Sequence, residues 1–371
     1  KNILHDTMLH HSTPFYTALS NLPQGQLFVL TDDHTAVHCL PILAEFIGDM
    51  PYHLLTIEAG ERNKTLTSVQ RVWDFLLQHR ATREALLINL GGGMVTDLGG
   101  FAAATYMRGI RFVNIPTTLL AMVDASSGGK TGVDYQDIKN VIGTFTPPLA
   151  TLIHSPFLLT LPATELLSGF AEMLKHALIA SPEEWIKLLQ LAQQELPQAQ
   201  FVQALSERGL LHNSIAIKEQ VVAEDPREAG MRKILNFGHT VGHAIESAAL
   251  HNSLQPSTFN SQPSTFNPTQ PSHGYCVLWG MVAELYLSVV HAGCPREVLQ
   301  QLVQIMLQYY GRPTCNCKQR EELIQRMYQD KKNEANCSPN FTLLRAVGEP
   351  IINQHLSDTD INEALEYLFS L

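Results

Sequence analysis

The sequence has little positive charge. It carries 25 lysines and arginines against 35 aspartates and glutamates in 371 residues, a formal net charge of −10. Without a basic run, a nucleic-acid partner is not expected. No uninterrupted run of 18 apolar residues and no signal-peptide pattern occurs, so we expect a cytoplasmic protein with no membrane partner. The six cysteines include no C-x-x-C pair, which favours reduced thiols.

Two phosphate-binding motifs are incomplete. Gly91-Gly92-Gly93 follows an apolar run, but Thr96 stands where the dinucleotide motif G-x-G-x-x-G has its third glycine. The turn can still bring backbone amides to a pyrophosphate at a helix N-terminus. The segment SSGGKTGV, residues 126–133, lacks the first glycine of a P-loop, because Asp124 stands there. We interpret it as an amide-rich turn that contains Lys130 and suits an anionic group.

A third motif is more distinctive. The segment NFGHTVGHAIE, residues 236–246, places His239, His243 and Glu246 at i, i+4 and i+7, on one helical face. Imidazoles and carboxylates are zinc ligands. A metalloprotease is excluded, because H-E-x-x-H needs a glutamate where Thr240 stands. Taken alone, the segment is either a metal site or a helix with two structural histidines.

Further ligands come from two other segments. FAEMLKHA contains Glu172, and HGYCVLWGMVAEL begins at His273. Glu172, His239 and His273 form a set of one carboxylate and two imidazoles, which leaves a coordination position open, as a catalytic metal requires. His251 is the alternative to His273.

Hydrophobic periodicity divides the chain into two parts. In residues 1–161, short apolar runs predict strands at Leu27–Leu30, His53–Ile57, Leu86–Leu90, Phe112–Ile115 and Thr151–Ile153, with helices at Leu66–Gln78 and Thr96–Thr105. This alternation predicts an α/β domain with a mostly parallel, Rossmann-like sheet. Residues 162–371 predict an all-α domain with helices at Thr164–Ala180, Gln200–Val222, His239–Ala249, Gly274–His291 and Arg296–Tyr310. We expect the active site in a cleft between the two domains.

Over nearly its whole length the chain resembles the 3-dehydroquinate synthases of the sugar-phosphate cyclase superfamily. It carries, in the family's order, the segments GGGMVTDLGGFAAATYMRG, IPTTLLAMVDASSGGKTGVD, KNVIG, LSGFAEMLKHA and LNFGHTVGH. The resemblance implies an NAD-dependent enzyme with zinc or cobalt, commonly a homodimer. Its metal ligands would be Glu172, His239 and His273.

The resemblance also implies the binding residues. The NAD site would comprise Asp32, Glu61, Lys64, Gly92, Gly93, Met94, Asp97, Thr117, Thr118, Leu120, Asp124, Lys139, Thr160, Leu161 and Glu165. Asp33 is an alternative to Asp32. The substrate site would comprise Arg108, Asp124, Lys130, Lys139, Asn140, Lys175, Lys218, Arg232, Asn236, His243 and one of Lys331 and Lys332. Arg232 and Asn236 would share a helical face with His239 if that helix begins early.

The implied reaction converts 3-deoxy-D-arabino-heptulosonate 7-phosphate to 3-dehydroquinate and phosphate. It proceeds by transient oxidation with NAD, phosphate elimination, re-reduction and an intramolecular aldol closure. Cationic side chains would neutralise the carboxylate and phosphate of the substrate. The residues expected to act in catalysis are His243, Lys130, Lys175, Arg232 and Asn236. His243 either shuttles a proton or only hydrogen-bonds a substrate oxygen.

Three other functions agree less well with these residues. A polyol dehydrogenase would not need so many cations for a neutral substrate. A sister cyclase for another sugar phosphate would be expected to change Lys218, Arg232 and Asn236, which recognise the carboxylate. An inactive NAD-binding regulatory module would not be expected to keep all the metal ligands and cations.

One segment departs from the family. QPSTFN occurs at Gln255–Asn260 and again at Gln262–Asn267, in an insertion that separates two of the expected metal ligands. Its polar, proline-containing composition predicts a mobile loop. Because the chain begins with Lys1 and not methionine, we expect a few residues to precede it.

Overall fold

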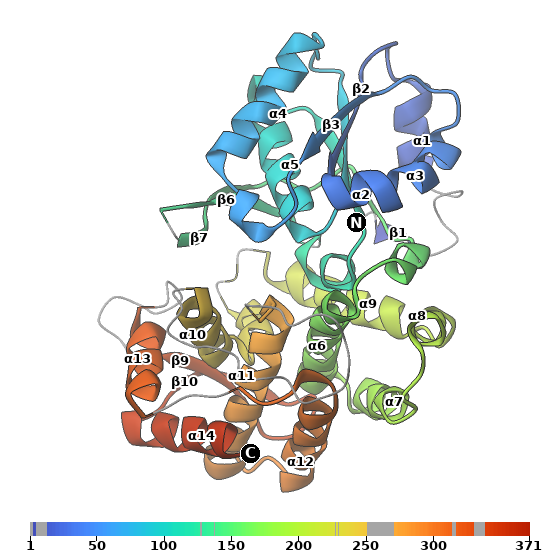
Figure 1. Ribbon diagram of the computed structural model, residues 1–371. Coiled ribbons are helices and arrows are strands. Elements are labelled where there is room, and N and C mark those ends of the chain that lie inside the picture. Colours follow the sequence, from blue (N-terminus) through green and yellow to red (C-terminus); the bar gives the residue numbers. More distant parts are fainter. Residues whose placement is uncertain are drawn as a thin grey trace. The chain divides into compact units, whose positions relative to one another are not determined.

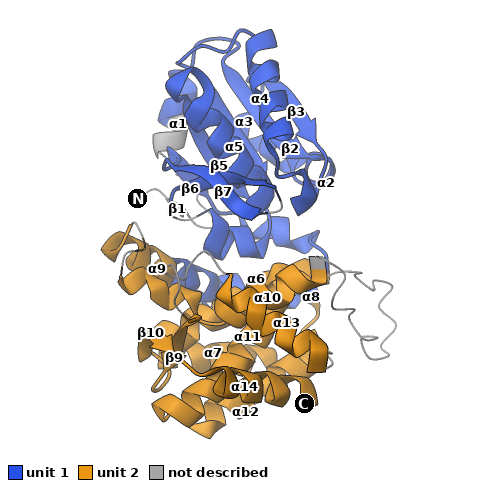
Figure 2. Ribbon diagram, turned by 90° about the vertical axis from the view of Figure 1, so that its left-hand side faces the viewer, with its two compact units in different colours: residues 1–162, 198–215 blue, residues 163–197, 216–371 orange. Residues whose placement is uncertain are grey.

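The computed structural model describes residues 3–4, 13–126, 128–136, 138–226, 228, 230–250, 271–313, 317–329 and 338–371. The chain divides into two compact units (Figure 2). The first is Lys1–Pro162 with Gln198–Ile215, and the second is Ala163–Pro197 with Ala216–Leu371. The assignment of residues 1–161 and 162–371 to separate domains stays a prediction, because residues 198–215 return to the first unit. The repeat insertion and the alternative ligand His251 lie outside the described residues.

A parallel sheet forms the centre of the first unit. Within the described residues it has six strands in the order β1-β8-β5-β4-β2-β3, and every pair is parallel. Their bounds are β1 Ile3–Leu4, β8 Ala150–Leu152, β5 Arg111–Pro116, β4 Leu86–Gly91, β2 Leu27–Asp32 and β3 His53–Ile57. Strands β2 and β4 are buried along their whole length, which explains their nearly continuous apolar sequences. The predicted α/β fold is confirmed.

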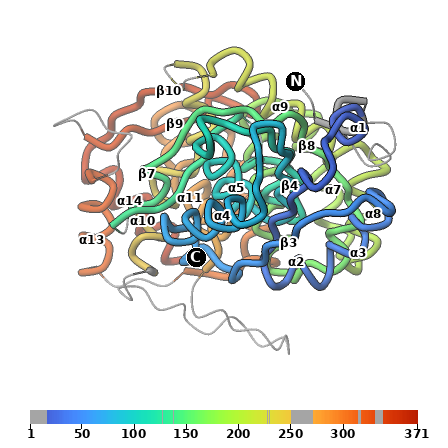
Figure 3. The backbone as a smooth tube through the Cα atoms, turned by 90° about the horizontal axis from the view of Figure 1, so that it is seen from above, coloured from blue at the N-terminus to red at the C-terminus, as the bar shows by residue number. Residues whose placement is uncertain are grey.

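Helices cover both faces of this sheet. Helices α4 (Leu66–Gln78) and α5 (Gly93–Thr105) lie side by side on one face, and α1 (Thr13–Ser20) and α3 (Leu40–Ile47) lie on the other (Figures 1 and 3). A core cluster that includes Phe28, Leu30, Val95 and Leu98 fills the space between α4, α5 and the sheet. This packing fixes the glycine turn between β4 and α5. Short elements complete this side of the chain: α2 Asp33–His38, η2 Glu61–Asn63, η3 Tyr106–Arg108, η4 Ala121–Ala125 and η5 Ser155–Leu159.

Two features, one of them at the junction of the two units in the sequence, differ from the prediction. Lys130 does not lie within a loop but begins β6 (Lys130–Tyr135), which forms an antiparallel hairpin with β7 (Ile138–Phe145). The turn before it is made by Gly128 and Gly129, whose φ angles are 95° and 66°. The single helix predicted for residues 200–222 is two helices, α8 (Gln198–Glu207) and α9 (Leu210–Glu224). Gly209, with φ 69°, separates them.

Helices dominate the second unit. The apolar helix α11 (His273–Leu287) packs against α10 (His239–Leu250), α6 (Ala163–Ala180) and α14 (Asp358–Ser370). The stretch His273–Ala292 is long and apolar enough to cross a membrane by composition alone, but 72% of its most apolar window is buried, as in the core helix of a globular domain. The other elements are α7 Pro182–Ala192, η6 Met231–Asn236, η7 Ser288–Ala292, α12 Arg296–Ile305, η8 Met306–Tyr310 and α13 Cys317–Tyr328.

The second unit is rich in helices, and the predicted all-α domain needs one correction: the unit also contains an antiparallel pair of strands. Strand β9 (Asn340–Leu344) pairs with β10 (Pro350–His355). The prediction missed this pair because both strands are short, and short apolar runs do not distinguish a strand from a buried helix. Gly348, with φ 83°, lies in the connection between them.

Candidate functional site

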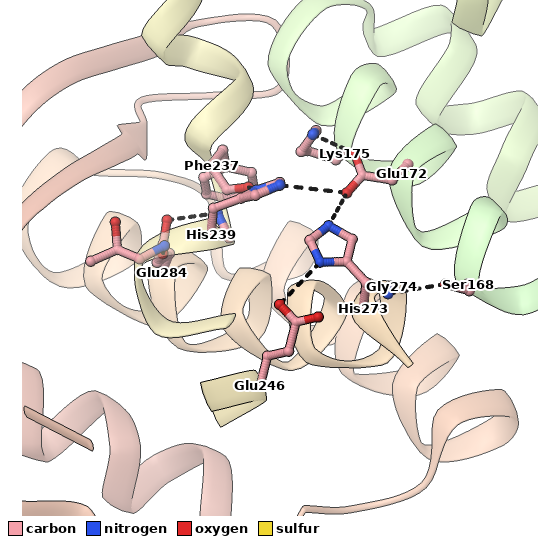
Figure 4. A network of polar contacts seen from close by, with 11 residues as sticks. Ser168, Glu172, Lys175, Phe237, His239, Glu246, His273, Gly274 and Glu284 are labelled. Carbon is pink, nitrogen blue, oxygen red and sulfur yellow. Dashed lines mark hydrogen bonds and ion pairs between the residues drawn. The ribbon is translucent and has the colours of Figure 1, made fainter. Parts of the chain in front are cut away.

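The three predicted metal ligands come together in the second unit, from three different helices. Glu172 lies in the middle of α6, and His239 and His273 are the first residues of α10 and α11. The Nε2 atoms of both histidines lie 3.7 Å from Oε1 of Glu172 (Figure 4). One ligand atom from each residue lies within 4.8 Å of the others. The described residues therefore present one carboxylate and two imidazoles to a common point.

The second ring nitrogen of each histidine is engaged elsewhere. Nδ1 of His239 lies 3.1 Å from the carbonyl oxygen of Phe237, and Nδ1 of His273 lies 3.3 Å from Oε2 of Glu246. A proton on each Nδ1 satisfies these acceptors and leaves both Nε2 lone pairs for a metal. Glu246 was part of the predicted histidine stripe but not of the ligand set, and the structure places it behind His273.

Electrostatics also suit a cation. Burial alone would lower the pKa of His273, but the charges of Glu246 and Glu172 raise that pKa to about 10. Glu172 is fully buried and forms an ion pair with Lys175, one turn further along α6. Two carboxylates around one imidazole create a negative potential that a bound divalent ion can neutralise. The donor set and its surroundings therefore fit zinc or cobalt.

His243 completes a cluster of three imidazoles. Its ring centroid lies 5.1 Å from that of His239 and 5.9 Å from that of His273. His243, Glu246 and His273 could also form a group of three ligands. We favour the group with Glu172, because there both imidazoles direct Nε2 at the carboxylate while their Nδ1 atoms have acceptors.

The substrate residues predicted in the second unit lie on different elements. Arg232 and Asn236 lie on η6, and α10 begins only at His239, so the early helix start that would place all three on one helical face does not occur. Gly238, with φ 79°, separates the two elements. The guanidinium of Arg232 donates to the carbonyl oxygen of Pro226 at 2.9 Å. Lys218 lies buried on α9. Lys331 and Lys332 lie outside the described residues.

In the first unit, Lys64 is the centre of a second cluster. Its Nζ lies 2.6 Å from Oδ2 of Asp97 and 2.6 Å from Oδ1 of Asn140. The carboxylate of Glu61 is 3.8 Å away. Burial alone would lower the pKa of Lys64, but Asp97 and Glu61 raise it, so the lysine is charged. The structure thus brings together three predicted NAD residues and one predicted substrate residue.

The glycine turn between β4 and α5 is tightly packed. A Cβ on Gly92 would lie 3.1 Å from Cγ2 of Thr118, and a Cβ on Gly93 would lie 3.1 Å from Cβ of Ala125. The glycines therefore allow a close approach of β4, α5 and the segment that follows β5. Gly92 precedes the first turn of α5 without a side-chain cap, so backbone N–H groups are presented there.

Asp32 and Asp33 both have structural contacts. Oδ1 of Asp32 accepts a hydrogen bond from the backbone N–H of Thr35 at 2.7 Å and caps α2. Oδ1 of Asp33 accepts one from the backbone N–H of Ala59 at 2.9 Å. Both residues stand at the carboxyl end of β2, where ligands of parallel sheets bind, so both stay candidates for the ribose contact.

Two predicted substrate residues have unusual backbones. Arg108 and Asn140 adopt φ angles of 68° and 51°, in the left-handed region. Such conformations concentrate at functional sites. The remaining predicted residues of the first unit occupy elements near the glycine turn or η5: Met94 on α5, Thr117, Thr118 and Leu120 after β5, Asp124 on η4, Lys139 on β7, and Thr160 and Leu161 after η5. Glu165 lies on α6 in the second unit, and burial raises its pKa.

Comparison with known proteins identifies the family. Residues 54–168 match the family model of the 3-dehydroquinate synthase N-terminal region, and residues 169–333 match that of its C-terminal region. The chain belongs to the 3-dehydroquinate synthase family. Its relatives include a 3-dehydroquinate synthase of Parabacteroides distasonis, 42% identical over 350 residues, which cover 94% of this chain and 93% of the relative.

Solved structures of sugar-phosphate cyclases share the fold. ValA, the 2-epi-5-epi-valiolone synthase of Streptomyces hygroscopicus, was solved with NAD+ and Zn2+ bound and has a TM-score of 0.82 at 25% identity, covering 100% of this chain and 96% of its own. A 2-deoxy-scyllo-inosose synthase, complexed with carbaglucose-6-phosphate, NAD+ and Co2+, has a TM-score of 0.79 at 21% identity, covering 98% and 96%. These two cyclases therefore share the architecture of this chain.

Proposed function

We propose that the protein is a 3-dehydroquinate synthase, a phosphate-eliminating carbon–oxygen lyase that depends on NAD and a divalent metal. Its substrate would be 3-deoxy-D-arabino-heptulosonate 7-phosphate and its products 3-dehydroquinate and phosphate. The observation that carries the proposal is the convergence of Glu172, His239 and His273 in a chain that belongs to this family. We further propose a cytoplasmic location, as expected for biosynthesis of aromatic amino acids through the shikimate pathway.

In this proposal Glu172, His239 and His273 hold the metal. When bound, the metal would acidify hydroxyl groups of the substrate, and NAD would take up and later return a hydride. Lys175 forms an ion pair with Glu172 and balances its charge. His243, next to both imidazole ligands, would either shuttle a proton or hydrogen-bond a substrate oxygen.

The substrate would be bound by side chains of both units, among which the cations would neutralise its anionic groups. The proposed set is Arg108, Asp124, Lys130, Lys139, Asn140, Lys175, Lys218, Arg232, Asn236 and His243, with Lys331 or Lys332. Lys130 is exposed at the start of β6, and Lys218 and Arg232 are buried. A buried cation can recognise a desolvated carboxylate, since charge-assisted hydrogen bonds are strongest away from water.

A homodimer is also proposed. The β6–β7 hairpin exposes Tyr135, Ile138, Val141 and Phe145, each at least 46% accessible. Apolar side chains grouped on one hairpin favour contact with another protein surface. A second copy of the chain is the partner expected from the family.

The assay for this function supplies the heptulosonate phosphate with zinc and a trace of NAD. We expect one phosphate released per turnover, no lasting NADH absorbance, and loss of activity with a chelator that Zn2+ or Co2+ reverses. A sugar phosphate without a carboxylate serves as the control and should react far more slowly. Stoichiometric NADH without phosphate release would instead support a polyol dehydrogenase.

A further inference from the structure

Glu284 is a fully buried acid on an otherwise apolar helix. It lies near the end of α11, three turns after His273, and its side chain is 0% exposed. A carboxylate with no access to water is costly unless hydrogen bonds compensate for the lost hydration. Glu284 is not among the candidate metal ligands, so its burial needs another explanation.

The hydrogen bonds of Glu284 explain its burial. Oε2 accepts the backbone N–H of Gly238 at 2.7 Å, and Oε1 accepts those of Thr240 and Val241 at 3.1 and 3.3 Å. These N–H groups belong to the start of α10, where a helix has no acceptors of its own. The positive end of the helix dipole also favours a carboxylate there. Glu284 therefore caps α10 from a neighbouring helix.

Close packing explains why α10 does not cap itself. The residue before His239 is Gly238, and a Cβ at that position would overlap the side chain of Met281. On the other side of the contact, a Cβ on Gly280 would overlap the carbonyl oxygen of Gly238. A serine or aspartate cap has no room between the two helices, so the acceptor has to come from α11.

We propose that Glu284 is a positioning residue of the metal site. It fastens the first turn of α10, which begins with His239, to α11, which begins with His273, and so sets the distance between the two imidazole ligands. The inference rests on the proposed metal set of Glu172, His239 and His273. It assigns to Glu284 no contact with metal or substrate.

The test loads metal-free protein with Co2+ and measures its affinity by chelator competition and its visible absorption spectrum. Glu284→Gln keeps the shape but presents one carbonyl oxygen and an NH2 group to three donors. We expect Co2+ affinity to fall roughly tenfold or more, in the range seen when groups behind metal ligands are changed. The absorption bands should shift because the ligand geometry changes, and NAD affinity should stay within about twofold.

Asp360→Asn is the matched control. Asp360 belongs to the capping box of α14 in the same unit, where its side chain contacts Ser357 and His291. This variant should lower the melting temperature without changing the Co2+ spectrum. An equal loss of Co2+ affinity in Asp360→Asn would show that general destabilisation is the cause and would overturn the proposal.

Two further outcomes are decisive. A folded Glu284→Gln with wild-type Co2+ affinity and spectrum would also overturn it. If that variant does not fold, Glu284→Asp keeps the charge and withdraws it by one methylene, and a smaller loss of affinity in the same direction is expected; wild-type behaviour of this variant contradicts the inference. Failure of the wild-type protein to bind Co2+ would instead contradict the proposed metal site itself.

Discussion

Lys64 in the first unit and Lys175 in the second are buried lysines that pair with a carboxylate, and the two pairs are built differently. Lys175 and Glu172 are one turn apart on α6. Lys64 instead reaches Asp97 on α5 and Asn140 on the β6–β7 hairpin, so its cluster needs three elements to pack together. A pair within one helix forms with the helix, whereas the second cluster depends on tertiary structure.

The elements that carry the two pairs also differ in kind. The metal ligands stand on long helices that meet through glycines and a buried cap. The Lys64 cluster stands at a helix start, a short helical turn and a hairpin, and Glu61 and Asn140 are exposed. Rigid elements hold a metal geometry, and loops adapt to a larger ligand. The comparison predicts that the two clusters can be damaged separately.

The largest effect is expected from Glu172→Gln. Loss of the carboxylate removes one ligand and leaves Lys175 buried without its partner, which costs about 3–5 kcal/mol of stability. Zinc affinity and turnover should fall by more than about 100-fold, beyond the loss expected for groups behind a ligand. NAD affinity, measured by calorimetry, should be retained.

The control for this prediction is Glu183→Gln, which changes an exposed glutamate that pairs with Lys187 on α7 at 2.7 Å. Surface pairs contribute little, so zinc binding and stability should stay near wild type. Zinc binding of wild-type strength in Glu172→Gln would show that the metal lies elsewhere.

Lys64→Met tests the other cluster. It removes the cation between Asp97 and Asn140, so NAD affinity should fall by about tenfold or more, as for a lost charge-assisted hydrogen bond. The free energy of unfolding should fall by about 1.5–3 kcal/mol, because Asp97, whose side chain is 18% exposed, loses a charge-assisted hydrogen bond. Co2+ affinity should not change.

A double variant separates stability from binding in this cluster. Adding Asp97→Asn to Lys64→Met should restore part of the stability without restoring NAD affinity. If Co2+ affinity falls together with NAD affinity, the two clusters are not independent and the comparison fails.

Glu246→Gln should have the smallest effect of the three on stability. The glutamine side chain can still accept from Nδ1 of His273, but the negative charge is lost, so zinc affinity should fall about 10- to 100-fold. Folding and NAD affinity should be preserved. A complete loss of bound zinc would indicate that Glu246 is itself a ligand, together with His243 and His273.

Much of the sheet unit could be predicted from sequence. Leu66–Gln78 is predicted and observed with the same bounds, because its apolar residues follow the helical period and Thr65 caps it. The hairpin of β6 and β7 was missed, because β7 is mostly exposed and neither strand has a clear apolar alternation. The pairing of such strands depends on packing against α5.

The candidate site, too, could be predicted from the sequence only in part. Spacing within one segment could bring His239, His243 and Glu246 to one face, but spacing could not show that Glu172 and His273, from two other segments, lie beside His239. Glu284 was missed because one acid in an apolar helix gives no local signal; only the contact with α10 shows its role. Long-range contacts of this kind are absent from sequence periodicity.

The return of residues 198–215 to the first unit has a consequence for how the protein is made. Nε2 of Gln198 on α8 donates to the carbonyl oxygens of Leu158 and Leu161, at 3.1 and 2.7 Å, so α8 secures the segment that follows the last strand of the sheet. Between residues 162 and 215 a ribosome adds 53 residues (215 − 162), which takes roughly 3–11 s. During that time α6 and α7 of the other unit emerge first. The first unit can therefore be completed only after part of the second has been synthesised, and a gene fragment that stops at Pro162 would encode a sheet without its last supporting helix.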